Sequence, residues 1–275
     1  MKFLLIFLLF SFSLKASETI TYAIGVENLQ YAPHFYVKKE NKKLVYKGFG
    51  RDIFDLFQEY YNTEEKIIAE KNNRSFLKIN FKYKPLPVKR LLTSLLDGRI
   101  DFKYPDNKFW GQGKKKEDLK KFARFRYSSP VTPFIDGILA HPNWKSKNKK
   151  FKTMATVLGF TPYPYLGDIK NKKVLLQHFP TLTKVISVIA KGKFDGAYVN
   201  IQVGLHKQKE LLEKGKISKK NALIFNQDLP SDKSNYHLST LNHHHIIEAF
   251  DRFLANKKYE ARINNLRKKH SLDNI

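Results

Sequence analysis

Six side chains have the chemistry to hold a small polar molecule, and each stands where a predicted strand ends or a helix begins. In open α/β sheets, ligand crevices form at the carboxyl ends of strands and the amino ends of the following helices. Arg90 stands between a predicted strand and a helix. Its guanidinium could hold a carboxylate or phosphate through two parallel hydrogen bonds. An ion pair at the surface or between lobes explains Arg90 equally well.

Three of the six candidates are aromatic. Tyr31 and Phe35 follow the first predicted strand, where a ring could stack on a ligand. Trp110 follows the strand that starts at Asp101, and it is one of two tryptophans in the chain. Packing in a core or at a rim is the alternative for these rings.

The last two candidates belong to the second half of the chain. Gly159 allows close backbone approach, so the Thr161 hydroxyl and nearby amides could bind an anion at a helix start. Asn200 follows a predicted strand and could both donate and accept hydrogen bonds to a ligand. Either residue could instead cap a helix.

Other reactive residue types point to structure and not to catalysis. Asp101 and Asp195 each begin a strand directly after a helix that ends in glycine, so we interpret both as structural. Adjacent histidines point in different directions, and no fixed carboxylate partner for 243–245 is evident, so we predict no metal site. No serine has a poised base, and the chain has no cysteine. We therefore expect no cofactor, no metal and no catalytic residue.

A sequence pattern of helix, glycine, aspartate and strand occurs twice in the chain, and the two copies position the candidates. An amphipathic helix ends at Gly98 and leads through Asp101 into a strand, and a second helix ends at Gly192 and leads through Asp195 into another. Strands and helices alternate along the chain, which predicts an α/β fold with mostly parallel sheets. One copy per lobe is the simplest explanation. The basic, apolar-poor tail from Asn256 is expected to pack only in part.

The first seventeen residues have the pattern of a secretory signal peptide. Lys2 precedes an apolar and hydroxyl run over 3–14, and small residues follow. The run is shorter than the ~20 residues of a membrane-spanning helix. We expect cleavage after Ala16 or Ser17 and export to the periplasm, with an uncleaved membrane anchor as the alternative.

The 275-residue chain is strongly basic, with 51 Lys and Arg against 25 Asp and Glu and a formal charge of +26. Such a field attracts polyanions. The basic residues are scattered, however, and the dense runs at 114–116 and 145–152 do not alternate with aromatic rings as a base-stacking surface would. We therefore expect a solvated surface and no nucleic-acid partner.

Four short motifs resemble those of a known family. They are Lys47 to Phe54, similar to KGFDvDl; Leu95 to Asp101, similar to LlsGkiD; Tyr127 to Pro130, similar to FSxPy; and Gly192 to Asn200, similar to GkvDaavxD. Together with the signal peptide, they resemble the periplasmic solute-binding proteins of ABC transporters, family 3. These proteins have the type 2 periplasmic-binding fold.

The resemblance implies two α/β lobes joined by two crossing strands, with a small ligand in the cleft between them. Hinge closure over the ligand would then present it to a membrane permease. We expect a signal peptide over 1–17, lobe 1 over 18–138, lobe 2 over 139–230 and a return to lobe 1 over 231–275. We expect the protein to act as a monomer.

Two departures from the amino-acid-binding members bear on the ligand. Those members carry a Thr-x-x-Arg element after the first strand of the pattern, where this chain continues from Pro105 to Trp110 without arginine. They also carry an acid where this chain has Asn200. We therefore expect a different ligand, small, polar and anionic, or none.

Two other functions are open. One is a periplasmic enzyme on the same scaffold, dehydratase-like and acting on a small carboxylic acid. It requires an acid or histidine buried in the cleft, and the six candidates include none, so we expect no enzyme. The other is a ligandless basic module that binds a surface or a sensor.

Overall fold

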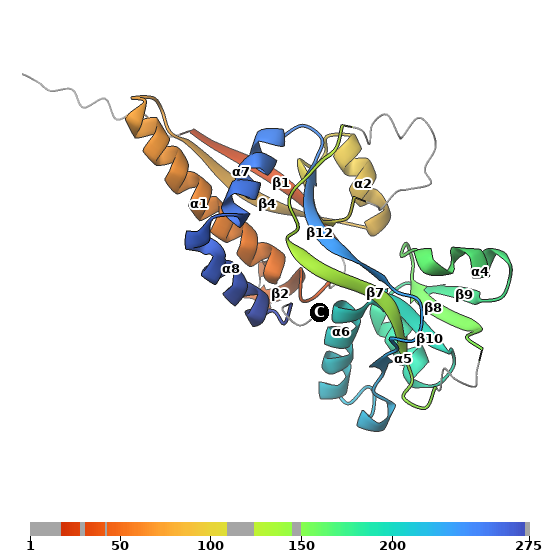
Figure 1. Ribbon diagram of the computed structural model, residues 1–275. Coiled ribbons are helices and arrows are strands. Elements are labelled where there is room, and N and C mark those ends of the chain that lie inside the picture. The colour runs from red at the N-terminus through yellow and green to blue at the C-terminus, as the bar shows by residue number, and fades with distance from the viewer. Residues whose placement is uncertain (1–17, 28–30, 42, 109–123, 145–149, 273–275) are drawn as a thin grey trace, which may run out of the picture.

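The computed structural model describes residues 18–27, 31–41, 43–108, 124–144 and 150–272. They form two α/β lobes joined by strands β7 (Thr132–Ala140) and β12 (Asp232–Thr240), as Figure 1 shows. The expected two-lobed α/β fold is confirmed. The expected signal peptide lies outside the described residues.

Lobe 1 is built on the parallel strands β4 (Leu77–Leu86), β1 (Glu18–Glu27) and β5 (Phe102–Asp106), in that order. The helices α1 (Phe49–Lys71), α7 (His244–Leu254) and α8 (Lys257–Lys269) pack on one face of this sheet, and α2 (Val88–Leu96) packs on the other. A hairpin of β2 (Tyr36–Glu40) and β3 (Lys43–Lys47) precedes α1, and the short β6 (Arg126–Tyr127) pairs with β12.

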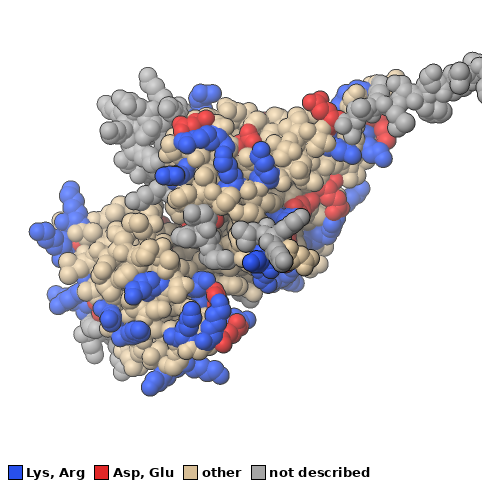
Figure 2. Space-filling model, turned by 180° about the vertical axis from the view of Figure 1, so that it is seen from behind, with Lys and Arg blue, Asp and Glu red and all other residues tan. Residues whose placement is uncertain are grey.

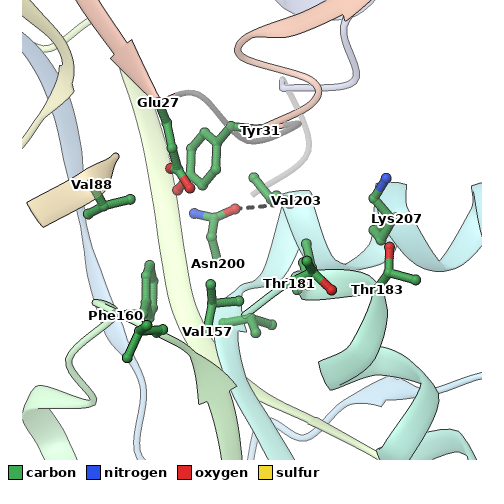
Figure 3. A pocket seen from close by; sticks show the side chains of 13 residues that line it. Glu27, Tyr31, Val88, Val157, Phe160, Thr181, Thr183, Asn200, Val203 and Lys207 are labelled. Carbon is green, nitrogen blue, oxygen red and sulfur yellow. Dashed lines mark hydrogen bonds between the residues drawn. The ribbon is translucent and has the colours of Figure 1, made fainter. Parts of the chain in front are cut away.

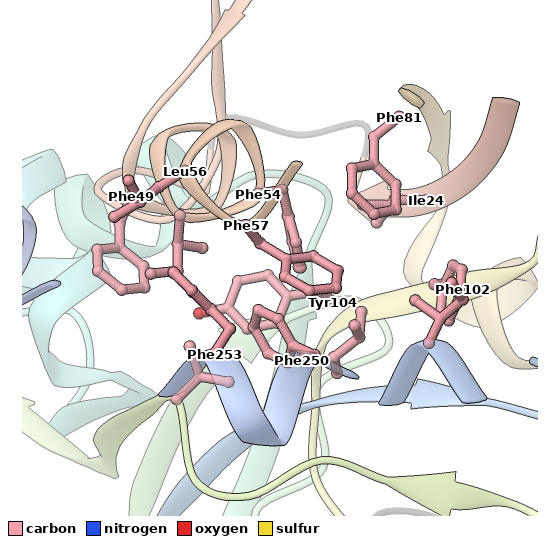
Figure 4. Close-up of a cluster of buried hydrophobic side chains, with 14 of the residues drawn as sticks. Ile24, Phe49, Phe54, Leu56, Phe57, Phe81, Phe102, Tyr104, Phe250 and Phe253 are labelled. Atoms are coloured by element: carbon pink, nitrogen blue, oxygen red, sulfur yellow. The ribbon is translucent and has the colours of Figure 1, made fainter. Parts of the chain in front are cut away.

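An aromatic cluster forms the core of lobe 1 (Figure 4). Phe54 and Phe57 of α1 follow the helical spacing seen in the sequence, and Phe81 comes from the alternating strand β4. The rings of Phe57 and Phe250 meet edge to face, with centroids 4.9 Å apart and planes at 75°. Each such buried ring stabilises the lobe by roughly 1.5–3 kcal/mol. The core therefore holds β1, whose carboxyl end carries Glu27, in a fixed position.

Lobe 2 repeats this arrangement with the parallel strands β10 (Gly196–Asn200), β8 (Thr153–Val157) and β9 (Leu175–Phe179). The helices α5 (Leu182–Ala190) and α6 (Ile201–Glu213) cover one face. The short helices η2 (Tyr163–Tyr165) and α4 (Leu166–Lys170) lie over the other. A 3-10 turn, η3 (Lys219–Asn221), and the short strand β11 (Ile224–Phe225), which pairs with β7, complete the lobe.

The two connecting strands run antiparallel to each other and pass from one lobe to the other. Residues 132–136 of β7 pair with 232–236 of β12. Beyond this segment β7 pairs with β10 of lobe 2, whereas β12 pairs with β5 of lobe 1. These strands are the only covalent connections between the lobes within the described part of the chain. The lobe boundaries expected at 138/139 and 230/231 stay predictions.

Asp101 and Asp195 have the structural roles that the sequence predicts. The Asp101 carboxylate accepts a hydrogen bond of 2.7 Å from the Ala23 amide, and that of Asp195 accepts one of 2.9 Å from the Thr153 amide. Each aspartate thus ties the start of its strand to a neighbouring strand. Asp101 also lies 3.0 Å from Nε2 of His243, a carboxylate partner that the sequence did not reveal.

Within the residues that the structure describes, no helix is both long and apolar enough to cross a membrane. The same residues contain no cluster of His, Asp or Glu arranged to hold a metal ion.

Candidate functional site

A cleft between the lobes contains two adjoining cavities. One has a volume of about 180 Å³ and reaches toward the start of α5, and we call it the α5-side cavity. The other has a volume of about 340 Å³ and extends along β5, and we call it the β5-side cavity. Both are lined by Glu27, Tyr31 and Val88 of lobe 1 and by Phe160 of lobe 2. A molecule in the cleft would therefore contact both lobes.

Glu27 stands at the carboxyl end of β1 and borders both cavities. Figure 3 shows it beside Tyr31, on the side of the cleft opposite Phe160. Partial burial raises the pKa of its carboxyl to about 7, although the Lys103 ammonium acts in the opposite direction. No Lys or Arg among the described residues forms an ion pair with it. A positively charged ligand group would supply the missing partner.

Asp136 is a second carboxyl in the cleft and comes from crossing strand β7. It is 5% exposed and lines the β5-side cavity. Burial raises the pKa of its carboxyl to about 8, which the Asn200 amide partly offsets and the Asp232 carboxylate reinforces. The Asn200 amide is its hydrogen-bond donor, at 3.3 Å. At neutral pH this carboxyl is therefore mostly protonated.

A chain of hydrogen bonds links lobe 1 to lobe 2 beside these carboxyls. The phenolic oxygens of Tyr31 and Tyr236 lie 2.7 Å apart, and the Asn200 amide donates to Tyr236 over 2.9 Å. Burial raises the pKa of both phenols well above 10, so they stay neutral. The Asn200 oxygen accepts from the Val203 amide at 3.0 Å and caps α6. The capping role considered for Asn200 is thus confirmed.

Polar groups at the start of α5 and on α6 form the other end of the α5-side cavity. Thr181 caps α5 by accepting from the Lys184 amide at 3.2 Å. Thr183 follows in the first turn, and Lys207 reaches this cavity from α6, 9% exposed and paired with Glu210. Helix amino ends favour negative charge. This end of the cavity is therefore suited to an anionic group.

A buried ion pair fixes the wall of the β5-side cavity. Nζ of Lys103 bonds to Oδ1 of Asp106, and the Ser239 hydroxyl donates to Oδ2 of Asp106 at 2.6 Å. Asp106 is 2% exposed, so its charge depends on these two side chains and on the Asn107 amide, which donates to Oδ1 at 2.9 Å. The pair positions the Lys103 ammonium close enough to Glu27 to lower the pKa of that carboxyl.

Three of the six sequence candidates meet in the cleft. Tyr31 lines both cavities, Asn200 lines the α5-side cavity and Thr161 the β5-side cavity. Arg90 is exposed on α2 and lines neither cavity. Trp110 lies outside the described residues.

Phe35 lies in the core of lobe 1 and not at the cleft. It is 1% exposed and packs against Tyr83 and Tyr104, with centroids 5.4 and 5.9 Å away. Its ring occupies space left by Gly50, where a Cβ would come within 2.3 Å of the ring. Phe35 therefore packs in a core, which was the alternative to stacking on a ligand.

Sequence reasoning missed the carboxyls of the cleft. Glu27 and Asp106 end strands β1 and β5, so the rule that selected the other candidates would have found both. Asp136 stands inside the apolar strand β7, and a charged residue in such a strand was the available signal. The expectation that the cleft holds no acid is thus corrected.

A third, larger cavity of about 1040 Å³ lies on the side of the crossing strands opposite the cleft, and we call it the rear cavity. Ile135 lines it, whereas its neighbour Asp136 faces the cleft, because successive residues of a strand point to opposite sides. Pro33 of lobe 1 and Leu205 of α6 also border the rear cavity.

In Figure 2, which shows the molecule from behind, Lys and Arg spread over both lobes without forming one patch.

No family model matches the sequence, and no curated protein matches it. Solved structures match the fold. An ancestral arginine-binding protein bound to arginine is 19% identical, with a TM-score of 0.60 over 91% of this chain and 97% of that one. An amino acid ABC transporter substrate-binding protein from Streptococcus pneumoniae, bound to L-arginine, is 16% identical, with a TM-score of 0.57 over 92% and 96%.

A third similar structure is an ancestral amino-acid-binding protein described as a precursor of cyclohexadienyl dehydratase. It is 16% identical, with a TM-score of 0.61 over 91% of this chain and 94% of that one. At these identities the likeness establishes the fold. The resemblance to substrate-binding proteins of ABC transporters, which rested on short motifs, is thereby confirmed at the level of the fold.

Proposed function

We propose that this protein is a periplasmic solute-binding protein that captures a small polar molecule between its lobes. The observation that carries the proposal is that side chains of both lobes line the same two cavities. A ligand that contacts both lobes stabilises their closed arrangement, and β7 and β12 supply the hinge. The closed form would then present the solute to a membrane permease.

The polar groups of the cleft favour a ligand with charges of both signs. The α5-side cavity has the Glu27 carboxyl at one end and Thr181, Thr183 and Lys207 at the other (Figure 3). An anionic group, as expected from the sequence, suits the second end, and a cationic group suits the first. Amino acids combine both charges, and the solved structures of similar fold include arginine-bound proteins.

A dehydratase-like enzyme is the second candidate. Near neutral pH Asp136 stays mostly protonated and Glu27 about half protonated, because burial raises the pKa of each carboxyl, to about 8 and about 7. A protonated carboxyl in a cleft can donate its proton to a departing hydroxyl. One similar structure is described as a precursor of a dehydratase. Product formation from a bound carboxylic acid would distinguish this function from binding.

A thermal-shift screen tests the proposed function. The purified protein is heated with amino acids, organic acids, sugars and inorganic phosphate in turn. A ligand at 100 times its dissociation constant adds about 2.7 kcal/mol to the free energy of unfolding, which gives a clear rise in melting temperature. Small-angle scattering should then show a smaller radius of gyration with the same ligand. No shift with any compound would contradict the proposal.

A further inference from the structure

Two carboxyls face the Tyr31 phenol from different elements. Glu27 extends from the end of β1, and Asp136 from crossing strand β7. The charge of each contributes to the raised pKa of the Tyr31 phenol, and both line the β5-side cavity. Two acids at one cavity repel each other's negative charge and attract a cation.

The surroundings of Asp136 offer it no cation. Its strand neighbour across β12 is Asp232, and the amide of Asn200 reaches it from β10. The phenols of Tyr31, Tyr198 and Tyr236 also interact with its charge. Within the described residues, no Lys, Arg or His acts on this carboxyl. Only hydrogen-bond donors are therefore available to balance an ionised Asp136.

Glu27 has a different environment. The Lys103 ammonium lowers the pKa of its carboxyl, and that ammonium is itself bound to Asp106. Of the two carboxyls, Glu27 is thus the easier to ionise. Asp136 holds its proton more firmly, because the amide of Asn200 is neutral and cannot replace a positive charge.

We infer that a cationic ligand enters the cleft by exchange for a proton, which the Asp136 carboxyl releases as the positive group of the ligand takes its place. The O–H bond of the acid breaks, the proton passes to the solvent buffer, and no electron is transferred. The inference rests on the proposed function. It makes Asp136 a residue that selects for positive charge.

The direction of the pH dependence follows from linkage. The pKa of the Asp136 carboxyl is about 8, so at lower pH the ligand must displace a bound proton. Affinity therefore rises with pH, by up to about tenfold per unit, and levels off above pH 8. Near pH 7, Asp136 should release close to one proton for each cationic ligand bound, and a neutral ligand should displace none from it.

Calorimetry with L-arginine tests the exchange, with L-citrulline as the neutral probe of nearly the same shape. Titrations at pH 7 in PIPES and in Tris, which differ in ionisation enthalpy, give the number of protons released. We expect at least close to one proton with arginine, because Glu27, about half protonated at pH 7, adds its own share to that of Asp136. Asp136→Asn should lower that number by close to one, whereas Glu27→Gln and the exposed control Asp168→Asn should still release the proton of Asp136. Equal arginine heats in both buffers would overturn the inference, and that measurement needs no variant.

A ligand-free titration separates failure of this inference from failure of the proposed function. Carboxyl carbon shifts are followed by NMR from pH 3 to pH 10, and the resonance lost in Asp136→Asn is assigned to Asp136. A midpoint near 4 overturns the inference whatever the protein binds. A midpoint near 8 with no binding of any compound in the thermal-shift screen means instead that the proposed function has failed, and the exchange falls with it. A midpoint near 8 with binding of neutral or anionic solutes alone overturns the exchange and leaves the proposed function standing.

Discussion

The hydroxyls of Tyr31 and Tyr236, 2.7 Å apart, join the loop after β1 to a strand that passes between the lobes. Asn200 extends this connection into lobe 2 through its 2.9 Å hydrogen bond to Tyr236. The same asparagine caps α6, which carries Lys207 toward the α5-side cavity. The crossing strand β12 and both walls of the cleft are therefore connected by one set of buried hydrogen bonds.

Tyr236→Phe tests this connection. The substitution removes the hydroxyl that Tyr31 and Asn200 share, and leaves the buried Asn200 amide without one of its partners. We expect the free energy of unfolding to fall by about 1–3 kcal/mol in urea titrations. The control Tyr46→Phe removes a half-buried hydroxyl and should change stability by less. Equal losses in the two variants would contradict a bridging role.

Asn200→Ala should cost more than the loss of a helix cap. Asn256 caps α8 through the Lys258 amide alone. The fall in unfolding free energy on Asn256→Ala therefore measures the contribution of a helix cap, about 1 kcal/mol. Asn200 also donates to Tyr236 and Asp136. We expect its substitution to lower the unfolding free energy by at least about 1 kcal/mol more. Similar losses in both variants would mean that the bonds to Tyr236 and Asp136 add no stability.

Glu27→Gln should weaken the binding of cationic solutes. A hydrogen bond to a charged group contributes about 1.5–3 kcal/mol, so the dissociation constant for L-arginine should rise at least about tenfold. Calorimetry at pH 8 provides the measurement. Glu64→Gln, an exposed change on α1, should leave the constant unaltered. An unchanged constant in Glu27→Gln would exclude Glu27 from the site.

Asp136 should make the ligand-free protein less stable as pH rises. The pKa of this carboxyl is raised from 3.8 to about 8 in the folded protein. Its stabilising contribution is therefore complete below about pH 4 and is lost as pH rises to about 8, by up to about 1.4 kcal/mol per pH unit.

The difference between wild type and Asp136→Asn isolates this effect. His34, whose buried imidazole has a pKa lowered to about 3, acts in the opposite direction below pH 6.5 in both proteins and cancels. We expect the stability difference measured by urea unfolding to change steadily between pH 5 and pH 8 in favour of the variant. A difference independent of pH would mean that Asp136 ionises normally.

The repeated pattern allowed much of the fold to be predicted from the sequence. A glycine in the left-handed conformation ends each of two amphipathic helices, at Gly98 and Gly192, and the aspartate that follows fixes the next strand. These are local signals. Helix α8 had no such signal, because Ile263 is its only described buried residue, with Tyr259 and Leu266 partly buried, and most of its other residues are charged or polar.

The candidate site was less predictable because it depends on contacts between distant parts of the chain. Asp136 and Asn200 are neighbours only through the register of β7 and β10. The position of Phe35 in the core depends on space that Gly50 leaves in α1. Pairings of this kind carry no periodic signal along the chain.

Ile135 and Asp136 are neighbours on crossing strand β7, and they line cavities on opposite sides of it. If the lobes close over the cleft as proposed, the rear cavity on the other side of the crossing strands must widen, and it must narrow when they part. The volume of the rear cavity, about 1040 Å³ in this structure, would therefore change with closure in the opposite sense to the cleft. A bulky group wedged there would tip the balance toward the shut form without touching the captured solute.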